Sequence, residues 1–302
     1  MAGWDRITFQ RITDSILNVL QLNIGANDPP RKDYDVYEKS VKVIVATNNK
    51  YRMPSDEMYL PVHVGAAGKK SIGYQRDDEG ENISGLNPYF CEITGLFWAW
   101  KNLEADYIGL VHYRRHFSFH PLRRDKWRAV LKKEDIERYL GAIKVFVPKK
   151  RRYFIETLYS HYAHTHYAVQ LDETRKIIEQ RYPEYLHSFD MVMKKRGGYM
   201  FNMMIMDREL LDEWCSWLFS VLFELKERLG EESLTPFHRR YCGRISEIIF
   251  NVWLQQNKSA GKIRRCEIKE IPVIHMEGIN WRKKGTAFLK AKFLGKKYSE
   301  SF

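Results

Sequence analysis

The predicted fold of this sequence depends most on the stretch Asp106–Phe119, which reads DYIGLVHYRRHFSF. It opens with the apolar run 107–111, whose length and β-branched content are typical of a buried strand. Polar and aromatic residues follow at once: His112, Tyr113, Arg114, Arg115 and His116. Ligands of open α/β sheets bind at the carboxyl ends of the strands, and arginine forks match phosphate oxygens. We therefore expect a diphosphate-binding site here.

Arg114 and Arg115 also have a simpler explanation. Arginines that follow a strand can pair with carboxylates on the surface, and such exposed ion pairs contribute little to stability. The residues alone leave this alternative open. The order of a buried strand followed directly by cations favours the ligand.

Composition limits the class of protein. A chain of 302 residues suits one α/β enzyme domain with helical additions, and its net charge of +12 indicates acidic partners. The four cysteines are widely spaced, which is typical of reduced thiols in the cytosol. No apolar run reaches the roughly 18 residues that span a bilayer, and no signal-peptide pattern opens the chain. We expect a protein of the cytosol or of the cytoplasmic face of the membrane.

The hydrophobic pattern predicts an α/β fold, in which a sheet is flanked by helices. Besides 107–111, strands are expected at 41–47, 60–66, 142–148 and 271–274, with a further apolar run at 199–206. Helices are expected at 88–101, 126–139, 159–166, 172–181, 185–193, 210–229 and 245–256. The predicted divisions are an N-terminal helical extension at 1–40, the α/β domain at 41–280 and a basic amphipathic tail at 281–302.

The tail carries a candidate membrane anchor. Residues 281–298 contain seven lysines and arginines, no acidic residue, and interleaved apolar side chains. This is the composition of a helix that lies in the membrane interface. A solvated basic helix packed on the domain is the alternative.

Small and amide residues follow the first two strands and leave room for a ligand beside the backbone. We expect the nucleotide part of a sugar donor to contact these residues. The predicted donor-binding residues are Thr47, Asn49, Gly65, Asn82, Ser84 and Asn87, and residues 112–115 complete the donor site.

Glu247 is the candidate catalytic base, because it falls on the first turn of the helix predicted at 245–256. The helix dipole there favours a carboxylate and keeps it ionised, which suits a base. Asp207 and Glu92 are the less favoured rivals, and Glu92 is expected instead to pair with an arginine of the opening strand. Arg115 and His112 complete the predicted catalytic set.

Three further residues are expected near the acceptor or the sugar. Asn202 is an amide in an apolar run and must find partners in the backbone or in a ligand. His166 is interpreted as a polar group near a sugar or phosphate, and Arg244 lies close to Glu247 in the block RISE.

A metal remains an open question. His161 and His164 lie three residues apart and could share a helix face, but no third ligand is in register. The sequence has no P-loop, no GxGxxG and no clean DxD, the aspartate pair that commonly binds a metal–nucleotide in sugar transferases. Mg²⁺ or Mn²⁺ stays conceivable without such a motif.

Seven blocks of this sequence resemble DUF4422, a bacterial family found among capsular and exopolysaccharide synthesis proteins and regarded as glycosyltransferases. They are YLPVHVGA (59–66), NISGLNPYFCEITGLFWAWKN (82–102), YIGLVHYRRHF (107–117), RYPEYLHSF (181–189), YMFNMMIM (199–206), WCSWLF (214–219) and RISEIIFNVWL (244–254). The basic end, 279–298, looks like the tail of that family.

The resemblance implies a GT-A-like (Rossmann-like) mixed sheet and transfer of a hexose from a nucleotide-diphosphate sugar. Family members have been linked to transfer of galactose or galactofuranose from UDP-sugars. The resemblance also implies a lipid-linked glycan acceptor in capsular, exopolysaccharide or O-antigen synthesis. The block 112–115 would occupy the strand end where other GT-A enzymes carry DxD. Its cations would neutralise the leaving diphosphate.

Two functions other than glycosyl transfer are compatible with parts of the sequence. A nucleic-acid-binding protein would suit the net charge of +12, but the aromatic residues fall in buried helical segments rather than between exposed cations. We therefore expect no nucleic-acid partner. A non-catalytic glycan-binding protein would explain the aromatic residues but not the cations at the end of the strand.

Overall fold

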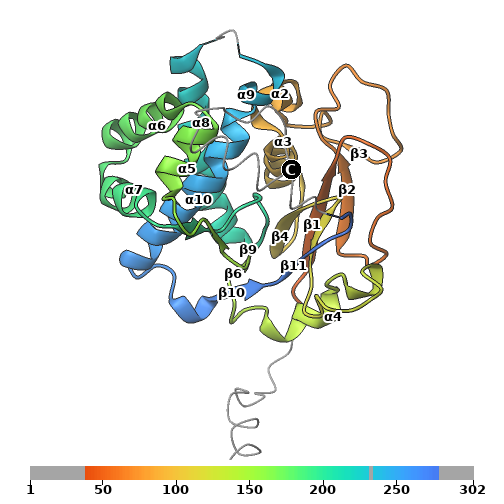
Figure 1. Cartoon of the computed structure of the whole chain (residues 1–302). Helices are drawn as coiled ribbons and strands as arrows, with labels where there is room; N and C mark the ends of the chain where they lie inside the picture. The colour runs from red at the N-terminus through yellow and green to blue at the C-terminus, as the bar shows by residue number, and fades with distance from the viewer. Residues whose placement is uncertain (1–37, 231–233, 279–302) are drawn as a thin grey trace, which may run out of the picture. The chain divides into compact units, whose positions relative to one another are not determined.

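The computed structural model describes residues 38–230 and 234–278, and the described residues from Lys39 onward form one compact unit. The sequence patterns at 1–37 and 281–302 lie outside the described residues. The fold is mixed α/β, as predicted, with a central, mostly parallel sheet flanked by helices (Figure 1).

The sheet places the predicted buried strand near its middle. Its strands follow one another in the order β10 (Ile268–Ile271), β6 (Val145–Pro148), β9 (Met204–Asp207), β4 (Tyr107–His112), β1 (Val41–Thr47), β2 (Tyr59–His63) and β3 (Gln75–Arg76). β1 runs parallel to β4 and β2, whereas β9 is antiparallel to β4 and β6. β5 (Arg115–Phe117) pairs with both β4 and β11 (Val273–His275). Because β1 and β4 are parallel, their carboxyl ends meet at one edge.

Within the described residues, most helices cover one face of the sheet, whereas a single four-residue helix and short turns cover the other. The helices are α2 (Asn87–Phe90), α3 (Ile93–Asn102), α5 (Leu158–Thr165), α6 (Ala168–Arg181), α7 (Leu186–Met193), α8 (Arg208–Leu229), α9 (Pro236–Arg239) and α10 (Tyr241–Ser259), with α4 (Lys133–Ile136) on the second face. Figure 1 shows α6, α7, α8 and α10 gathered on one side of the strands.

Strand alternation divides the core in two. Along β1, Ile44 packs with the buried side chains of α3, α8 and α10. Val43 and Val45 face the opposite cluster, which includes Leu131 and Ile136. Successive side chains of a strand point to opposite faces, so a strand that is apolar at both sets of positions must be covered on both sides.

Several predicted boundaries are wrong, and long-range contacts explain most of them. The helix predicted at 88–101 breaks at Cys91, whose φ is +55°. The helix predicted at 126–139 is a succession of short turns around α4. In the run 199–206 only the end becomes a strand, because Phe201 and Asn202 have φ of +78° and +52°. Left-handed backbone at non-glycine residues requires support from the surrounding structure.

Gly109 allows β4 to lie between its two neighbours. A Cβ at this position would lie 2.8 Å from the carbonyl oxygen of Met204 and 2.8 Å from Cγ1 of Ile205, both on β9. The carbonyl is backbone and cannot move away without disturbing the ladder between β4 and β9. Glycine is therefore required by close packing rather than by a special φ.

Gly109→Ala should lower the free energy of unfolding by about 1–3 kcal/mol, because overpacking of a tight core forces backbone shifts. Denaturant unfolding followed by circular dichroism measures it. Gly85→Ala is the matched control, since a Cβ there meets nothing within 4 Å. Equal stability of the two variants would contradict the prediction.

Candidate active site

A cleft of about 610 Å³ lies at the carboxyl ends of β1 and β4. Its walls come from these strand ends, from α2 and α3, from β7 (Arg151–Arg152) and from α5, α9 and α10. Among the described residues that line it, the arginines are Arg114, Arg115, Arg151, Arg239, Arg240 and Arg244. The carboxylates there are Glu92 and Glu247. This imbalance makes the cleft a site for anions.

The end of β4 turns back sharply instead of running on. His112 pairs antiparallel with Arg115, so Tyr113 and Arg114 form the bend between β4 and β5. His112 Nε2 lies 2.5 Å from the carbonyl oxygen of Phe201 and 3.9 Å from Oε1 of Glu92. Burial lowers the pKa of His112, which favours the neutral ring.

The bend separates the two arginines of the strand end. Arg114 Nη1 lies 3.0 Å from Oε2 of Glu277, and both side chains are about half exposed, so it fits the simpler explanation of a surface pair. Arg115 stacks 4.8 Å from the ring centre of Phe201. Its Nε is buried, and no acceptor among the described residues reaches it. Burial lowers the pKa of Arg115, while Glu247 and Glu92 oppose this effect.

The opposite wall supplies the expected Arg244 together with two arginines that the sequence analysis missed, Arg239 and Arg240. Arg239 and Arg240 precede α10, and Arg244 stacks 4.0 Å from the ring centre of Phe237. Within the described part of the chain, Arg239 Nε and Arg244 Nη1 are buried without a hydrogen-bond acceptor. The block HRRYCGR, residues 238–244, was the available signal. Arg151 was visible only as one member of a basic run.

Glu247 lies in the cleft, but the argument from the helix dipole is wrong. Since α10 begins at Tyr241, Glu247 falls in its second turn, where the dipole of the helix end has little effect. Burial raises the pKa of Glu247 to about 7, and the charge of Glu92 adds to this while Arg115 opposes it. A carboxyl that titrates near neutral pH can both accept and release a proton.

Asn202 lies behind the cleft rather than in its lining. Its Nδ2 donates to Oε1 of Glu92 at 2.8 Å and to the carbonyl oxygen of Gly243 at 2.9 Å. Its Oδ1 accepts from Ser246 Oγ at 2.6 Å. Glu92 therefore contacts Asn202 and His112, and its expected ion pair with an arginine of the strand end is absent among the described contacts. The remaining rival base, Asp207, caps α8 outside the cleft.

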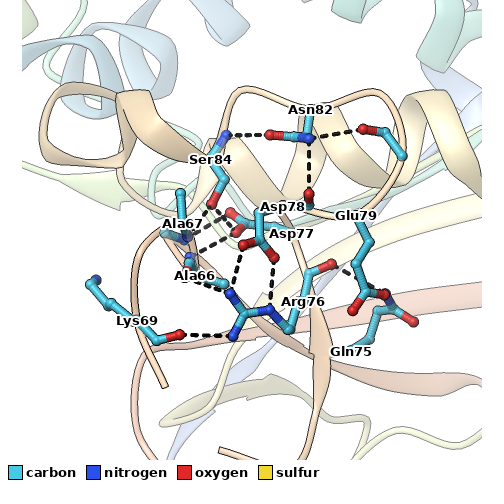
Figure 2. A network of polar contacts seen from close by, with 12 residues as sticks. Ala66, Ala67, Lys69, Gln75, Arg76, Asp77, Asp78, Glu79, Asn82 and Ser84 are labelled. Carbon is cyan, nitrogen blue, oxygen red and sulfur yellow. Dashed lines mark hydrogen bonds and ion pairs between the residues drawn. The ribbon is translucent and has the colours of Figure 1, made fainter. Parts of the chain in front are cut away.

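The predicted donor residues fall into two groups. Thr47 and Asn87 line the cleft, and Asn49, Gly65, Asn82 and Ser84 do not. Figure 2 shows the loop network in which Ser84 and Asn82 take part. The buried Asp77 accepts hydrogen bonds from the backbone of Gly65 and Ala66 and from Ser84 Oγ. Asn82 donates to the carbonyl oxygens of Asp78 and Gly80.

Gly65 acts on the cleft through Asn87. Its φ is +64°, and a Cβ there would lie 2.4 Å from Cγ of Asn87. Asn87 in turn donates from Nδ2 to the carbonyl oxygen of Cys91 at 2.7 Å. The glycine that sequence analysis assigned to ligand contact therefore makes room for a residue of the cleft wall.

His161 and His164 meet a carboxylate. His161 Nδ1 lies 2.7 Å from Oε2 of Glu156, and His164 Nδ1 lies 2.6 Å from Oε1. Burial lowers the pKa of His161 to about 4. Across residues 38–230 and 234–278, no group of three or more His, Cys, Asp or Glu side chains could hold a metal ion. His166 lines the cleft between the rings of Tyr162 and Phe237.

Comparison with known proteins gives the family. Residues 42–258 match the family described as Domain of unknown function (DUF4422), and the chain belongs to it. The fold is similar to the apo structure of the WbbM bifunctional glycosyltransferase, with a TM-score of 0.73 and 28% identity. The match covers 79% of this chain and 46% of that one, so the chain corresponds to less than half of WbbM. No curated protein matches. None of the helices within 38–230 and 234–278 combines the length and hydrophobicity that a membrane-spanning helix needs.

The pKa of Glu247 predicts a dependence of stability on pH. Because the folded pKa, about 7, lies above the ordinary 4.5, the native state binds more protons between these values, and its stability falls as pH rises through this window. Glu247→Gln should be more stable than the wild type by about 1–3 kcal/mol above pH 7 and equal to it below pH 4.5. Urea unfolding across this range measures the difference. The exposed Glu104→Gln is the control, and a constant difference would contradict the prediction.

Proposed function

We propose that this chain is a glycosyltransferase that transfers a hexose from a nucleotide-diphosphate sugar to a glycan acceptor. The observation that carries the proposal is the convergence of Arg115 and Arg244 on one cleft, each with a buried guanidinium nitrogen that has no acceptor among the described residues. Buried donors of this kind need a partner, and a diphosphate supplies several oxygens. The similarity of the fold to a glycosyltransferase structure also supports this proposal.

The arginines would act on the leaving group. Transfer of the sugar leaves negative charge on the diphosphate, and fixed cations in a cleft stabilise the charge as it develops. Arg115 would contact the diphosphate from the β4 side, and Arg244 and Arg240 from α10 and the residue before it. Mg²⁺ or Mn²⁺ could share this task, and activity with and without EDTA decides the point.

The nucleotide would lie against the ends of β1 and β2. Thr47 and Asn87 line the cleft there, and the loop ordered by Asp77 supports them from behind. Of the other expected donor residues, Asn49, Gly65, Asn82 and Ser84 would shape this part of the site without lining the cleft as it stands.

Glu247 would be the group that takes the proton from the acceptor hydroxyl. It faces the cleft, and its pKa of about 7 matches the range in which a base works best. His166 also lines the cleft and would contact the acceptor or the transferred sugar. Arg244, which the sequence analysis placed with it, is assigned here to the diphosphate.

The proposed acceptor and pathway are inferred from the resemblance of the sequence blocks to the family. A lipid-linked glycan in capsular, exopolysaccharide or O-antigen synthesis is the acceptor we propose to test, with UDP-galactose among the first donors. Residues 281–298, the candidate anchor to an anionic cytoplasmic membrane surface, lie outside the described residues.

Arg115→Ala should reduce turnover of UDP-hexose about 10²–10³-fold, because a lost donor to the developing charge costs roughly 2–4 kcal/mol. Release of UDP, measured across a panel of UDP-hexoses, reads the effect. Arg151→Ala should also lower turnover, whereas Arg152→Ala is the matched control, since Arg151 lines the cleft and Arg152 does not. Unchanged turnover in a folded Arg115→Ala protein removes Arg115 from the site. UDP binding without turnover in the wild type would favour the glycan-binding alternative.

Glu247→Gln should lower kcat about 10²-fold or more while leaving the KM for the donor nearly unchanged, because the amide keeps the shape and loses the basicity. The wild-type rate should rise with pH through about 7, and the variant should lose this rise. Initial rates from pH 5.5 to 9 provide the measurement. A wild-type rate in the variant would exclude Glu247 as the base. That outcome would fit a mechanism that retains anomeric configuration, because such a mechanism needs no base of this kind.

A further inference from the structure

An apolar turn projects from the surface directly after β7. The side chains of Phe154 and Ile155 are 76% and 54% exposed. Surface turns are usually built from small and polar residues, and two adjacent large apolar side chains that remain largely exposed to water are unusual there. Their exposure therefore calls for an explanation outside the stability of the fold.

The turn is anchored at both ends and is not a loose loop. Phe154 has φ of +51°, and Ile155 N donates to the carbonyl oxygen of Tyr153 at 2.6 Å. The residues on either side, Tyr153 and Glu156, are 7% and 2% exposed. Glu156 is fixed by His161 and His164, which gives this buried carboxylate and its two imidazoles a structural task. The apolar tip is thus presented in a fixed position.

Exposed cations lie on the two chain segments that meet at this turn, 149–152 and 194–196. They are Lys149, Lys150, Arg152, Lys194, Lys195 and Arg196. Tyr153 N donates to the carbonyl oxygen of Arg196 at 2.8 Å, and Arg196 Nη1 donates to that of Phe154 at 3.3 Å, which places the second basic run beside the turn. Arg152 pairs with Gly197 in the ladder of β7 with β8 (Gly197–Gly198).

In the described part of the chain, none of these cations lies within 4 Å of a carboxylate oxygen. Five of them help to line an open hollow of about 670 Å³, where Glu270 accepts a hydrogen bond from Tyr199. Burial lowers the pKa of Lys195, and the charge of Lys150 adds to the effect. An anion placed here would relieve this repulsion.

The strand β7 connects this surface to the cleft. Side chains alternate along a strand, and here Arg151 lines the cleft while Arg152 lines the hollow. The hollow and the cleft therefore share the β7 ribbon as a wall. Anything bound to the cationic surface lies close to the opening of the site.

We propose that Phe154, Ile155 and the six exposed cations form a surface that docks on an anionic lipid bilayer. The apolar tip enters the interface and the lysines and arginines contact the phosphate headgroups. Single-stranded nucleic acid and glycans favour flat aromatic platforms, which an isoleucine does not provide, so the pair fits acyl chains better. This surface consists of other residues than the candidate anchor at 281–298, and the inference does not depend on the proposed reaction.

The test is co-sedimentation of the full chain with vesicles. Vesicles of phosphatidylcholine with 30% phosphatidylglycerol should bind the protein at low salt, and pure phosphatidylcholine vesicles should bind it weakly. Phe154→Ser with Ile155→Ser should weaken binding on the order of tenfold through lost apolar burial. Lys149→Glu with Lys150→Glu should weaken it at least about 25-fold, at roughly fivefold per cation. High salt should reduce the second effect.

Matched controls carry the same chemical changes elsewhere. Leu122→Ser removes a side chain that is 98% exposed in another basic loop, and Lys69→Glu with Lys70→Glu reverses two adjacent exposed lysines between β2 and β3. Both should bind vesicles nearly as the wild type does. The inference is overturned if the surface variants bind as the wild type, if the controls lose as much, or if the variants lose binding to heparin or single-stranded DNA instead of vesicles.

Two further measurements separate the outcomes. Deletion of 281–302 should leave binding that still depends on Phe154 and Ile155, and loss of all vesicle binding on that deletion alone would assign the membrane contact to the tail. Thermal unfolding and UDP binding of the surface variants should match the wild type, because none of the changed residues lines the cleft. UDP binding thus reports on the proposed function independently of lipid.

Discussion

The side-chain amide of Asn202 is the contact on which the geometry of the cleft depends. It joins three segments that are distant in the sequence, because it donates to Glu92 before α3 and to Gly243 in α10 and accepts from Ser246 one turn on. The left-handed backbone at Phe201 and Asn202 directs this amide inward. The carbonyl oxygen of Phe201 meets His112 at the same time. One bend therefore sets the positions of the β4 end, of α3 and of the helix that carries Glu247.

The electrostatics of the cleft follow from this arrangement. Glu92 and Glu247 are held near one another in a partly buried wall, and the repulsion between them is one of the reasons why the second carboxyl binds its proton so tightly. Arg115 moderates the effect without forming an ion pair within 4 Å in the described structure. A cleft rich in guanidinium groups thus keeps a carboxyl that titrates in the neutral range.

Sequence patterns predicted the elements whose structure is decided locally. The strand 41–47 and the long helix around 210–229 follow directly from uninterrupted periodicity. Errors arose where distant contacts override local preference, as at Cys91, where the chain bends under Gly243. For the same reason, the sequence patterns predicted only part of the candidate site. The cations after the central strand are contiguous, whereas Arg239 and Arg240 reach the cleft only because α10 packs across the sheet end.

The placement of β10 and β11 bears on where the domain ends. The family match stops at residue 258, yet β10 completes the sheet beside β6, and β11 covers β5. Glu277, just beyond β11, also holds Arg114 at the mouth of the site. A fragment that ended at residue 258 would leave two strands with unpaired backbone edges, which favours aggregation. The segment matched by the family model is therefore shorter than the sheet of the described structure, and a fragment cut at the family boundary should aggregate more readily than one that includes β10 and β11.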